Sequence, residues 1–269
     1  MLTDIILGQY FPGTSFVHHL DPRTKLLGTI VFIASIFLAE GTAAYVVLTL
    51  FAALAIGIGR IPLKMVLRSL RPLSIIIVLT MVIHLFSTPG TVLYHLGPLT
   101  ITAEGIRQGI LMTSRLVFLI LMSSLLTFTT SPIMLTDGIE RLLNPFRRIG
   151  LPAHELAMMM TIALRFIPTL LEETDRIMKA QMARGADFAE GNLLRRAKSM
   201  VPLLVPLFIS AFRRADELAV AMEARCYQGG ANRTRMKELQ FAFQDGVACA
   251  AILALTALLG VLRWNAILN

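Results

Sequence analysis

The sequence predicts an all-α, polytopic membrane protein with five transmembrane helices and a region of amphipathic helices between spans four and five. Hydrophobic residues make up 55% of the 269-residue chain, the mean hydropathy is +0.70, and only 16% of the residues are charged. Soluble domains carry about 25% charged residues, so this composition indicates a surface that largely faces lipid. Apolar stretches of spanning length and a charge alternation between the loops complete the prediction.

The spans follow from the lengths of the apolar stretches, because one crossing needs about 20 residues. The run Leu26–Gly59 is too long for a single crossing and is broken at Glu40-Gly41-Thr42. We therefore interpret it as a hairpin of two helices. The five predicted spans cover residues 24–39, 43–59, 72–87, 105–129 and 241–262.

The loop charges predict the orientation, because Lys and Arg gather on the cytoplasmic side. Loops 39–43 and 88–104 carry neither residue, whereas residues 131–240 carry sixteen. The other basic residues used for this assignment are Arg23 and Lys25 before span one, Arg60, Lys64, Arg68 and Arg71 before span three, and Arg263 after span five. This pattern predicts a cytoplasmic N-terminus and an extracellular C-terminus.

The chain is thereby divided into a membrane region (1–130), a cytoplasmic region (131–240) and a last span with the C-terminus (241–269). In the cytoplasmic region, the apolar runs Leu156–Leu171 and Val201–Phe212 are interrupted by charges and prolines. Either run could dip into the membrane, but we favour amphipathic helices at the inner surface. The cluster Arg195, Arg196 and Lys198 suits anionic lipid headgroups.

Two stretches of this region repeat at an offset of 41 residues: DRIMKAQMARG (Asp175–Gly185) and DELAVAMEARC (Asp216–Cys226). Both have helical periodicity and are followed by a stop, at Gly185 and at Gly229-Gly230. Arg184 and Arg225 are therefore expected near helix C-termini, where a cation complements the dipole. Each arginine alone is an ordinary cap, but two copies indicate a pair of docking elements.

The second repeat has an apolar stripe at three- and four-residue spacing, and charges on the opposite face. The stripe contains Phe208, Phe212, Ala215, Leu218, Ala219 and Met222; the charged face contains Arg213, Arg214, Asp216, Glu217 and Glu223. From the residues alone, the stripe is a candidate for packing against the chain's own spans.

Three motifs carry a family resemblance: GQYFPGTSFVHHLDPRTKLL (Gly8–Leu27), QMARGADF (Gln181–Phe188) and ARCYQGG (Ala224–Gly230). With the order of spans, they resemble the transmembrane T component of energy-coupling factor transporters, which are importers of the ATP-binding-cassette superfamily in bacterial plasma membranes. The resemblance implies a scaffold that holds two cytoplasmic ATPases and one integral-membrane, substrate-binding S component, for the uptake of vitamins or other micronutrients.

The resemblance also implies site residues. Two coupling helices would end in Ala-Arg-Gly motifs that dock on the ATPases, here Ala183, Arg184 and Gly185, and Ala224, Arg225 and Cys226. Cys226 departs from the family glycine, but cysteine is small and weakly polar, so docking is expected to survive. The candidates for S-component contact are Phe208, Phe212, Leu218 and Met222.

The residues argue against an enzyme. No G-x-x-x-x-G-K-[ST] loop is present to hold ATP phosphates, so no cofactor is expected here, and ATP and Mg would be bound by the partner ATPases. His154-Glu155 begins like a zinc-protease motif, but Met158 occupies the second histidine position. Arg115 lies within span four, where a charge is costly; it either faces the bundle interior or reaches an interface.

Two other functional classes are compatible with a multi-spanning membrane protein. A self-sufficient secondary transporter is disfavoured because the spans have almost no midplane acids and no clear inverted repeat. An intramembrane enzyme is disfavoured by the missing catalytic motifs. The sequence does not name the transported substrate.

Overall fold

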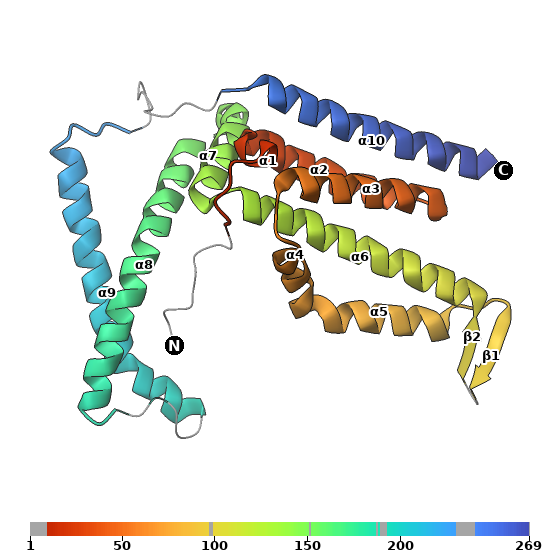
Figure 1. Ribbon diagram of the computed structural model, residues 1–269. Coiled ribbons are helices and arrows are strands. Elements are labelled where there is room, and N and C mark those ends of the chain that lie inside the picture. The colour runs from red at the N-terminus through yellow and green to blue at the C-terminus, as the bar shows by residue number, and fades with distance from the viewer. Residues whose placement is uncertain are drawn as a thin grey trace. The chain divides into compact units, whose positions relative to one another are not determined.

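The computed structural model describes residues 10–96, 99–150, 152–186, 188, 193–229 and 240–268. Helices dominate this part of the chain (Figure 1). They are α1 (Phe16–His19), α2 (Pro22–Leu38), α3 (Gly41–Gly59), α4 (Leu63–Leu70), α5 (Ser74–Ser87), α6 (Ala103–Thr129), α7 (Pro132–Leu143), α8 (Ala153–Ala183), α9 (Leu193–Glu223) and α10 (Phe243–Leu268), with 3₁₀ turns η1 (Arg71–Leu73) and η2 (Asn144–Ile149).

The chain forms two compact units. Among the described residues, the membrane unit consists of residues 10–138 and 240–268, and the helix-pair unit of residues from 139 to 229. The structure thus joins the last span to the first four in one unit. The sequence instead divides the chain by membrane side, at 130 and 240, and that division by side stays a prediction.

Five of the described helices are long and apolar enough to cross a membrane, as the fold class predicts, but they are not the same five. They are Gly41–Gly59, Leu63–Ser87, Ala103–Thr129, Ala153–Ala183 and Phe243–Asn265. The predicted first span is α2, whose 17 residues extend only about 26 Å. The fifth helix that meets the criteria of length and hydropathy is instead α8, which is the least apolar of the five. Its charges concentrate after Leu171, which leaves an apolar first half.

The core of the membrane unit lies between α2, α3, α6 and α10. Phe32 of α2 is fully buried, and its ring stacks on Phe51 of α3 with 5.5 Å between centroids. Small and polar groups bring α2 against α10: a Cβ on Gly28 would lie 2.6 Å from Ile252, and the hydroxyls of Ser35 and Thr256 hydrogen-bond at 2.8 Å. Small residues and interhelical hydrogen bonds are the usual means of helix association in lipid.

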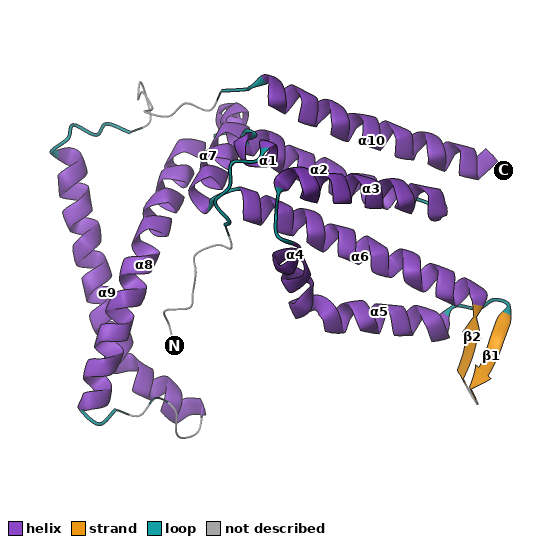
Figure 2. Ribbon diagram, in the orientation of Figure 1, coloured by secondary structure: helices purple, strands orange, loops and turns teal. Residues whose placement is uncertain are grey.

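The loop between spans three and four differs from expectation, because it contains a short β-hairpin (Figure 2). Strand β1 (Val92–Leu96) pairs antiparallel with β2 (Leu99–Thr102). The Glu104 carboxylate accepts the Thr91 N–H at 2.7 Å, and Thr102 caps α6 by accepting the Gly105 N–H at 3.0 Å. Helix α6 approaches α5 closely at Gly105 and Gly109, which are four positions apart. A Cβ on Gly105 would lie 2.9 Å from the His84 carbonyl.

The outer faces of the spans expose large apolar side chains. On α3 the stripe Val46, Leu50, Leu54 and Ile58 is exposed at four-residue spacing. Most of α5 is exposed too, with Ile75 at 78%. In water such a continuous apolar surface would be a liability, so these faces indicate contact with lipid or with another membrane subunit.

Candidate functional site

The first candidate docking motif lies at a well-defined helix end. Helix α8 ends at Ala183, with Arg184 as the C-cap and Gly185 in the left-handed region at φ +86°. The Gly185 N–H donates to the Met182 carbonyl, and the Ala186 N–H donates to the Gln181 carbonyl, both at 3.0 Å. This pair of bonds is the Schellman motif, which favours glycine at the left-handed position.

The second motif repeats this geometry 41 residues later. The Cys226 N–H donates to the Glu223 carbonyl at 2.8 Å, and the Tyr227 N–H donates to the Met222 carbonyl at 3.1 Å. Cys226 takes the left-handed conformation at φ +57° in the position of Gly185. The departure from glycine therefore keeps the shape of the helix end, at a steric cost of about 1–2 kcal/mol for a residue with a Cβ.

Both motifs are open to the surface of the helix-pair unit. Ala183, Arg184 and Gly185 are exposed, as are Ala224, Arg225 and Cys226. Within the part of the chain that the structure describes, neither arginine forms an ion pair. Gly230 and the side chains of Arg195 and Arg196 lie outside the described residues.

Helices α8 and α9 pack side by side in opposite directions (Figure 1). Glu173 and Arg214 form an ion pair at 3.0 Å where the helices meet. Towards one end of the pair, the Gln181 side chain reaches the Pro202 carbonyl at 3.4 Å. Arg184 and Arg225 each lie eleven residues beyond this ion pair, about 16 Å along their own helices. Because the helices are antiparallel, the two motifs lie at opposite ends of the pair.

The apolar stripe predicted on α9 divides in two. Phe208 and Phe212 are 60% and 69% exposed, whereas Leu218 and Met222 are half-buried. Leu218 follows Phe212 by six positions. In a helix with 3.6 residues per turn, this spacing places Leu218 on a different face from the phenylalanines. The exposed apolar surface instead continues through Val201, Val205 and Ile209.

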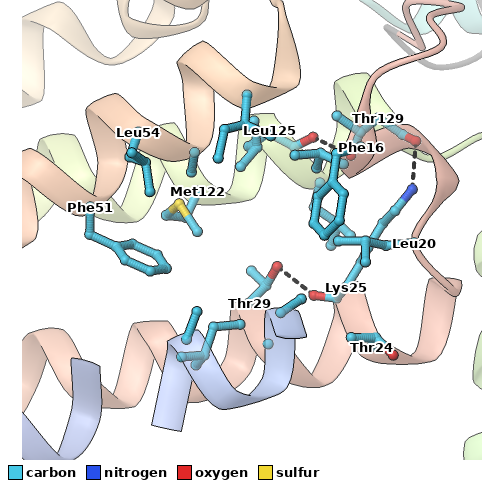
Figure 3. A pocket seen from close by; sticks show the side chains of 18 residues that line it. Phe16, Leu20, Thr24, Lys25, Thr29, Phe51, Leu54, Met122, Leu125 and Thr129 are labelled. Atoms are coloured by element: carbon cyan, nitrogen blue, oxygen red, sulfur yellow. Dashed lines mark hydrogen bonds between the residues drawn. The ribbon is translucent and has the colours of Figure 1, made fainter. Parts of the chain in front are cut away.

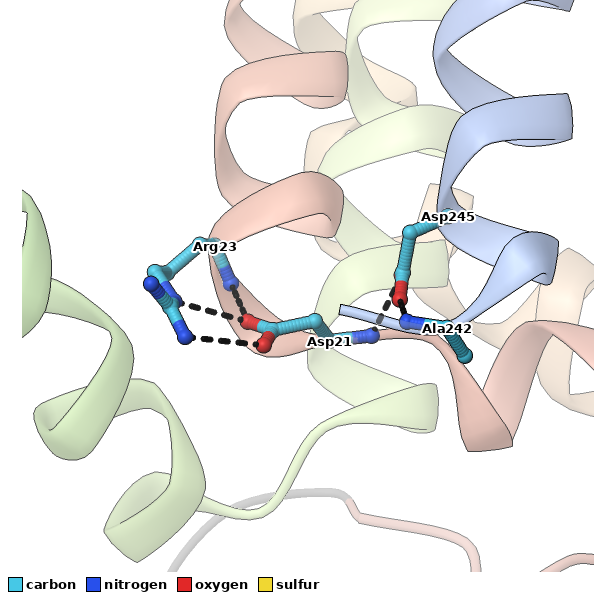
Figure 4. A network of polar contacts seen from close by, with 4 residues as sticks. All are labelled: Asp21, Arg23, Ala242 and Asp245. Carbon is cyan, nitrogen blue, oxygen red and sulfur yellow. Dashed lines mark hydrogen bonds and ion pairs between the residues drawn. The ribbon is translucent and has the colours of Figure 1, made fainter. Parts of the chain in front are cut away.

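A second polar site, at one end of the membrane unit, involves residues that the sequence analysis treated only as charges or motif letters. The buried Asp245 accepts the Asp21 N–H at 2.7 Å and the Ala242 N–H at 2.8 Å (Figure 4). Asp21 in turn accepts the Arg23 N–H at 2.8 Å and pairs with its guanidinium. Arg23 also lies over the Phe241 ring at 4.4 Å. The starts of α2 and α10 are thereby joined.

Lys25 connects the same corner to α6. It is only 7% exposed. Its ammonium donates to the His18 carbonyl at 3.0 Å and to the Thr129 carbonyl at 2.9 Å, and Figure 3 shows the second of these bonds. Thr129 is the last residue of α6, so Lys25 satisfies an end carbonyl of that helix. On α7, a Cβ at Gly138 would lie 3.0 Å from Pro22. We call this site (His18, Asp21, Lys25, Thr129 and Asp245) the polar corner.

His18 is buried in the polar corner as a neutral ring. Burial lowers the pKa of its imidazole. Its Nε2 lies 3.0 Å from the Phe11 carbonyl, which can only accept, so Nε2 carries the proton and Nδ1 accepts from the Ser15 hydroxyl at 2.6 Å. Beside the corner lies an apolar cavity of about 150 Å³ between α1, α2, α3, α6 and α10 (Figure 3). Phe16, Phe51, Met122 and Leu125 contribute to its lining.

Other polar candidates have structural partners. His154 contacts the Glu140 carboxylate at 3.0 Å within the helix-pair unit. In the described residues no group of three or more His, Cys, Asp and Glu could hold a metal ion. The sequence analysis missed the Glu173–Arg214 pair, although a signal existed: the repeat places Glu172-Glu173 at the positions of Arg213-Arg214. It also counted Lys25 as a charge before span one, whereas Lys25 lies inside α2 and is buried.

Comparisons with known proteins agree with these observations. The family described as CbiQ, cobalt transport protein, matches residues 13–236. The energy-coupling factor transporter transmembrane protein EcfT of Acidaminococcus fermentans is 61% identical over 98% of this chain and 99% of its own length. The EcfT proteins of Thermosediminibacter oceani and Bacillus subtilis are 58% and 49% identical, each over 98% of this chain and 100% of their own length. The chain therefore belongs to the CbiQ/EcfT family of transmembrane components of energy-coupling factor transporters.

Proposed function

We propose that this chain is the scaffold and energy-coupling subunit of an importer, and that it transmits the motion of two cytoplasmic ATPases to a membrane-embedded S component. The observation that supports this most strongly is the pair of matched helix ends on α8 and α9. Each end exposes an alanine, an arginine and a left-handed residue in one geometry. Two equal protrusions at opposite ends of one helix pair suit two similar ATPase subunits.

The arginines supply the chemistry of docking. Each guanidinium offers five donors in a fixed plane, which can grip carboxylates or carbonyls in a groove of an ATPase. The neighbouring alanines, Ala183 and Ala224, allow close approach. ATP and Mg would be bound by the ATPases, and this chain would perform no catalytic step.

The contacts of the polar corner support a cytoplasmic position for residues 131–240. The end of α6 and the start of α10 both contact the start of α2, through Thr129–Lys25 and Asp245–Asp21. The chain between α6 and α10 therefore leaves the membrane and enters it again on the same side. This requires that the segment crosses the membrane an even number of times. Among the described helices between α6 and α10, only α8 is long and apolar enough to cross. One crossing would be an odd number, so α8 is not expected to span the membrane. The loop charges then favour a cytoplasmic N-terminus and an extracellular C-terminus in the bacterial plasma membrane.

The exposed phenylalanines of α9 are our candidates for the contact with the S component. Phe208 and Phe212 lie one helical turn apart, and both are exposed on the helix-pair unit. Leu218 and Met222 would contribute less, because they are already half-buried. The S component would select the substrate, a vitamin or another micronutrient.

The proposal is tested by purifying the tagged chain in a mild detergent from the cell that expresses it. We expect two ATPase chains and an integral-membrane subunit to co-purify, and uptake to require ATP hydrolysis by those chains. Substrate uptake by the isolated chain in liposomes, without ATPases, would instead identify a self-sufficient secondary transporter.

A further inference from the structure

Arg115 is a cation in the middle of a membrane span. It follows the first residue of α6 by twelve positions and precedes the last by fourteen, about 18 Å and about 21 Å along the helix. Snorkelling relieves arginines near helix ends, but Arg115 lies close to the midpoint. The backbone of Arg115 is thus about equally far from the two ends of α6.

The contacts that Arg115 makes within the chain are weak. Its Nη1 lies 3.7 Å from the Met112 sulfur, and its guanidinium lies over the Phe37 ring at 5.4 Å from the centroid. Its Nε is buried without a hydrogen-bond partner. Lys25, the buried cation at the inner end of the unit, instead donates to two carbonyls at 2.9 and 3.0 Å.

Every described carboxylate of the membrane unit is already engaged elsewhere. Asp21 pairs with Arg23, and Asp245 accepts two backbone N–H groups. Glu40 pairs with Arg263 at 3.0 Å, and Glu104 accepts from Thr91. Asp137 also has an interaction, and Arg115 is not its partner. No acid of this unit is left to neutralise Arg115 among the residues that the structure describes.

We propose that Arg115 binds an acidic side chain from a transmembrane helix of the S component. The inference rests on the proposed function, since the ATPases are cytoplasmic and cannot reach mid-membrane. Arg115 is half-buried, so part of its side chain is open to the surface of the unit. The ring of Phe37 on α2, which lies under the guanidinium, is 58% exposed and offers an apolar contact beside the charge. An intramembrane carboxylate and an intramembrane arginine neutralise each other, which removes the main cost of both.

The test compares the composition of complexes purified from cells that express the variants. Arg115→Gln should lower the amount of S component recovered roughly 30-fold or more, as expected when one partner of a buried charge pair is removed, with the ATPases retained. Arg107→Gln is the matched control, since Arg107 is exposed near the start of the same helix, and this variant should assemble normally. Arg115→Lys should retain more S component than Arg115→Gln, because it keeps the charge.

A second arm identifies the partner and separates binding from folding. Each intramembrane Asp and Glu of the co-purified S component is changed to Asn or Gln, and one change should reproduce the loss. Combining Arg115→Asp with Arg at that position should restore recovery.

If the wild type retains the S component and Arg115→Gln retains it equally, the inference is wrong while the proposed function stands. If every Arg115 variant also loses the ATPases or fails to accumulate, Arg115 has a structural role. If the wild type itself lacks an S component, the proposed function fails.

Discussion

Glu173 and Arg214 lie 41 residues apart and form an ion pair at 3.0 Å between α8 and α9. The same offset relates the two helix ends at Gly185 and Cys226. The contact thus joins equivalent positions of the repeat, which carry opposite charges. Because equivalent residues meet there, the two candidate docking motifs lie at equal distances along their helices from one contact.

Opposite charges at equivalent positions allow the pair to be exchanged. Glu173→Ala and Arg214→Ala should each destabilise the helix pair, by about 1 kcal/mol for side chains that are partly exposed. The exchange Glu173→Arg with Arg214→Glu should recover most of this loss. Thermal unfolding in detergent measures the coupling in a double-mutant cycle. The exposed pair Arg213–Glu217 is the control, and equal coupling in both pairs would argue against a special role for the interhelical contact.

Arg184 and Arg225, the proposed docking arginines, should be needed for transport. We expect Arg184→Ala and Arg225→Ala each to weaken uptake, and the double change to abolish it, because losing one partner of a buried charged hydrogen bond costs about 2–5 kcal/mol. Lysine should rescue poorly, since it lacks the planar fork. Uptake in whole cells and co-purification of the ATPases measure the two effects separately. Arg213→Ala is the control, and wild-type uptake by the double variant would identify both arginines as surface caps.

The left-handed conformation of Cys226 predicts a stabilising substitution. Cys226→Gly should relieve the steric cost of a Cβ at φ +57° and raise the stability of the helix-pair unit by about 1 kcal/mol. Gly185→Ala should have the opposite effect at the equivalent position. Both are measured by thermal unfolding in detergent, and Cys249→Ala controls for simple thiol loss. A Cys226→Gly variant less stable than the wild type would show that the thiol has contacts of its own.

The Lys25 ammonium should stabilise the membrane unit. Lys25→Met keeps most of the side-chain volume but leaves the carbonyls of His18 and Thr129 without a donor in a buried site. We expect a loss of roughly 1–3 kcal/mol, measured as the unfolding midpoint of the purified chain. The exposed Lys64 provides the matched control, Lys64→Met, which should change little. Equal effects of the two substitutions would mean that the loss reflects charge alone.

Membrane sidedness is measurable with single cysteines. In a background with Cys226→Ser and Cys249→Ala, Leu93→Cys in the β-hairpin should react with an impermeant thiol reagent in intact cells. Lys64→Cys and Arg213→Cys should react only after the membrane is opened. Labelling of Arg213→Cys from outside would overturn the cytoplasmic position of the helix-pair unit.

Local signals in the sequence were sufficient for several elements. Glu40-Gly41 predicts the break between α2 and α3, and the structure places it there, with Gly41 at φ +80°. Gly185 predicts the end of α8, because a glycine supplies the left-handed residue that closes a helix. Such signals act within a few residues, so they can be interpreted without knowing what surrounds them.

The sequence by itself thus determined the helical membrane class, the break between α2 and α3, the end of α8 and the repeat. Only the tertiary structure decided that Lys25 and Asp245 are buried, and that Phe212 is exposed while Leu218 is half-covered. Asp21 and Asp245 are 224 residues apart, and no pattern along the chain says that they meet. The physical reason is that periodicity identifies the apolar face of a helix but not the neighbour that covers it. The burial of a charge likewise depends on which distant group comes within hydrogen-bonding distance.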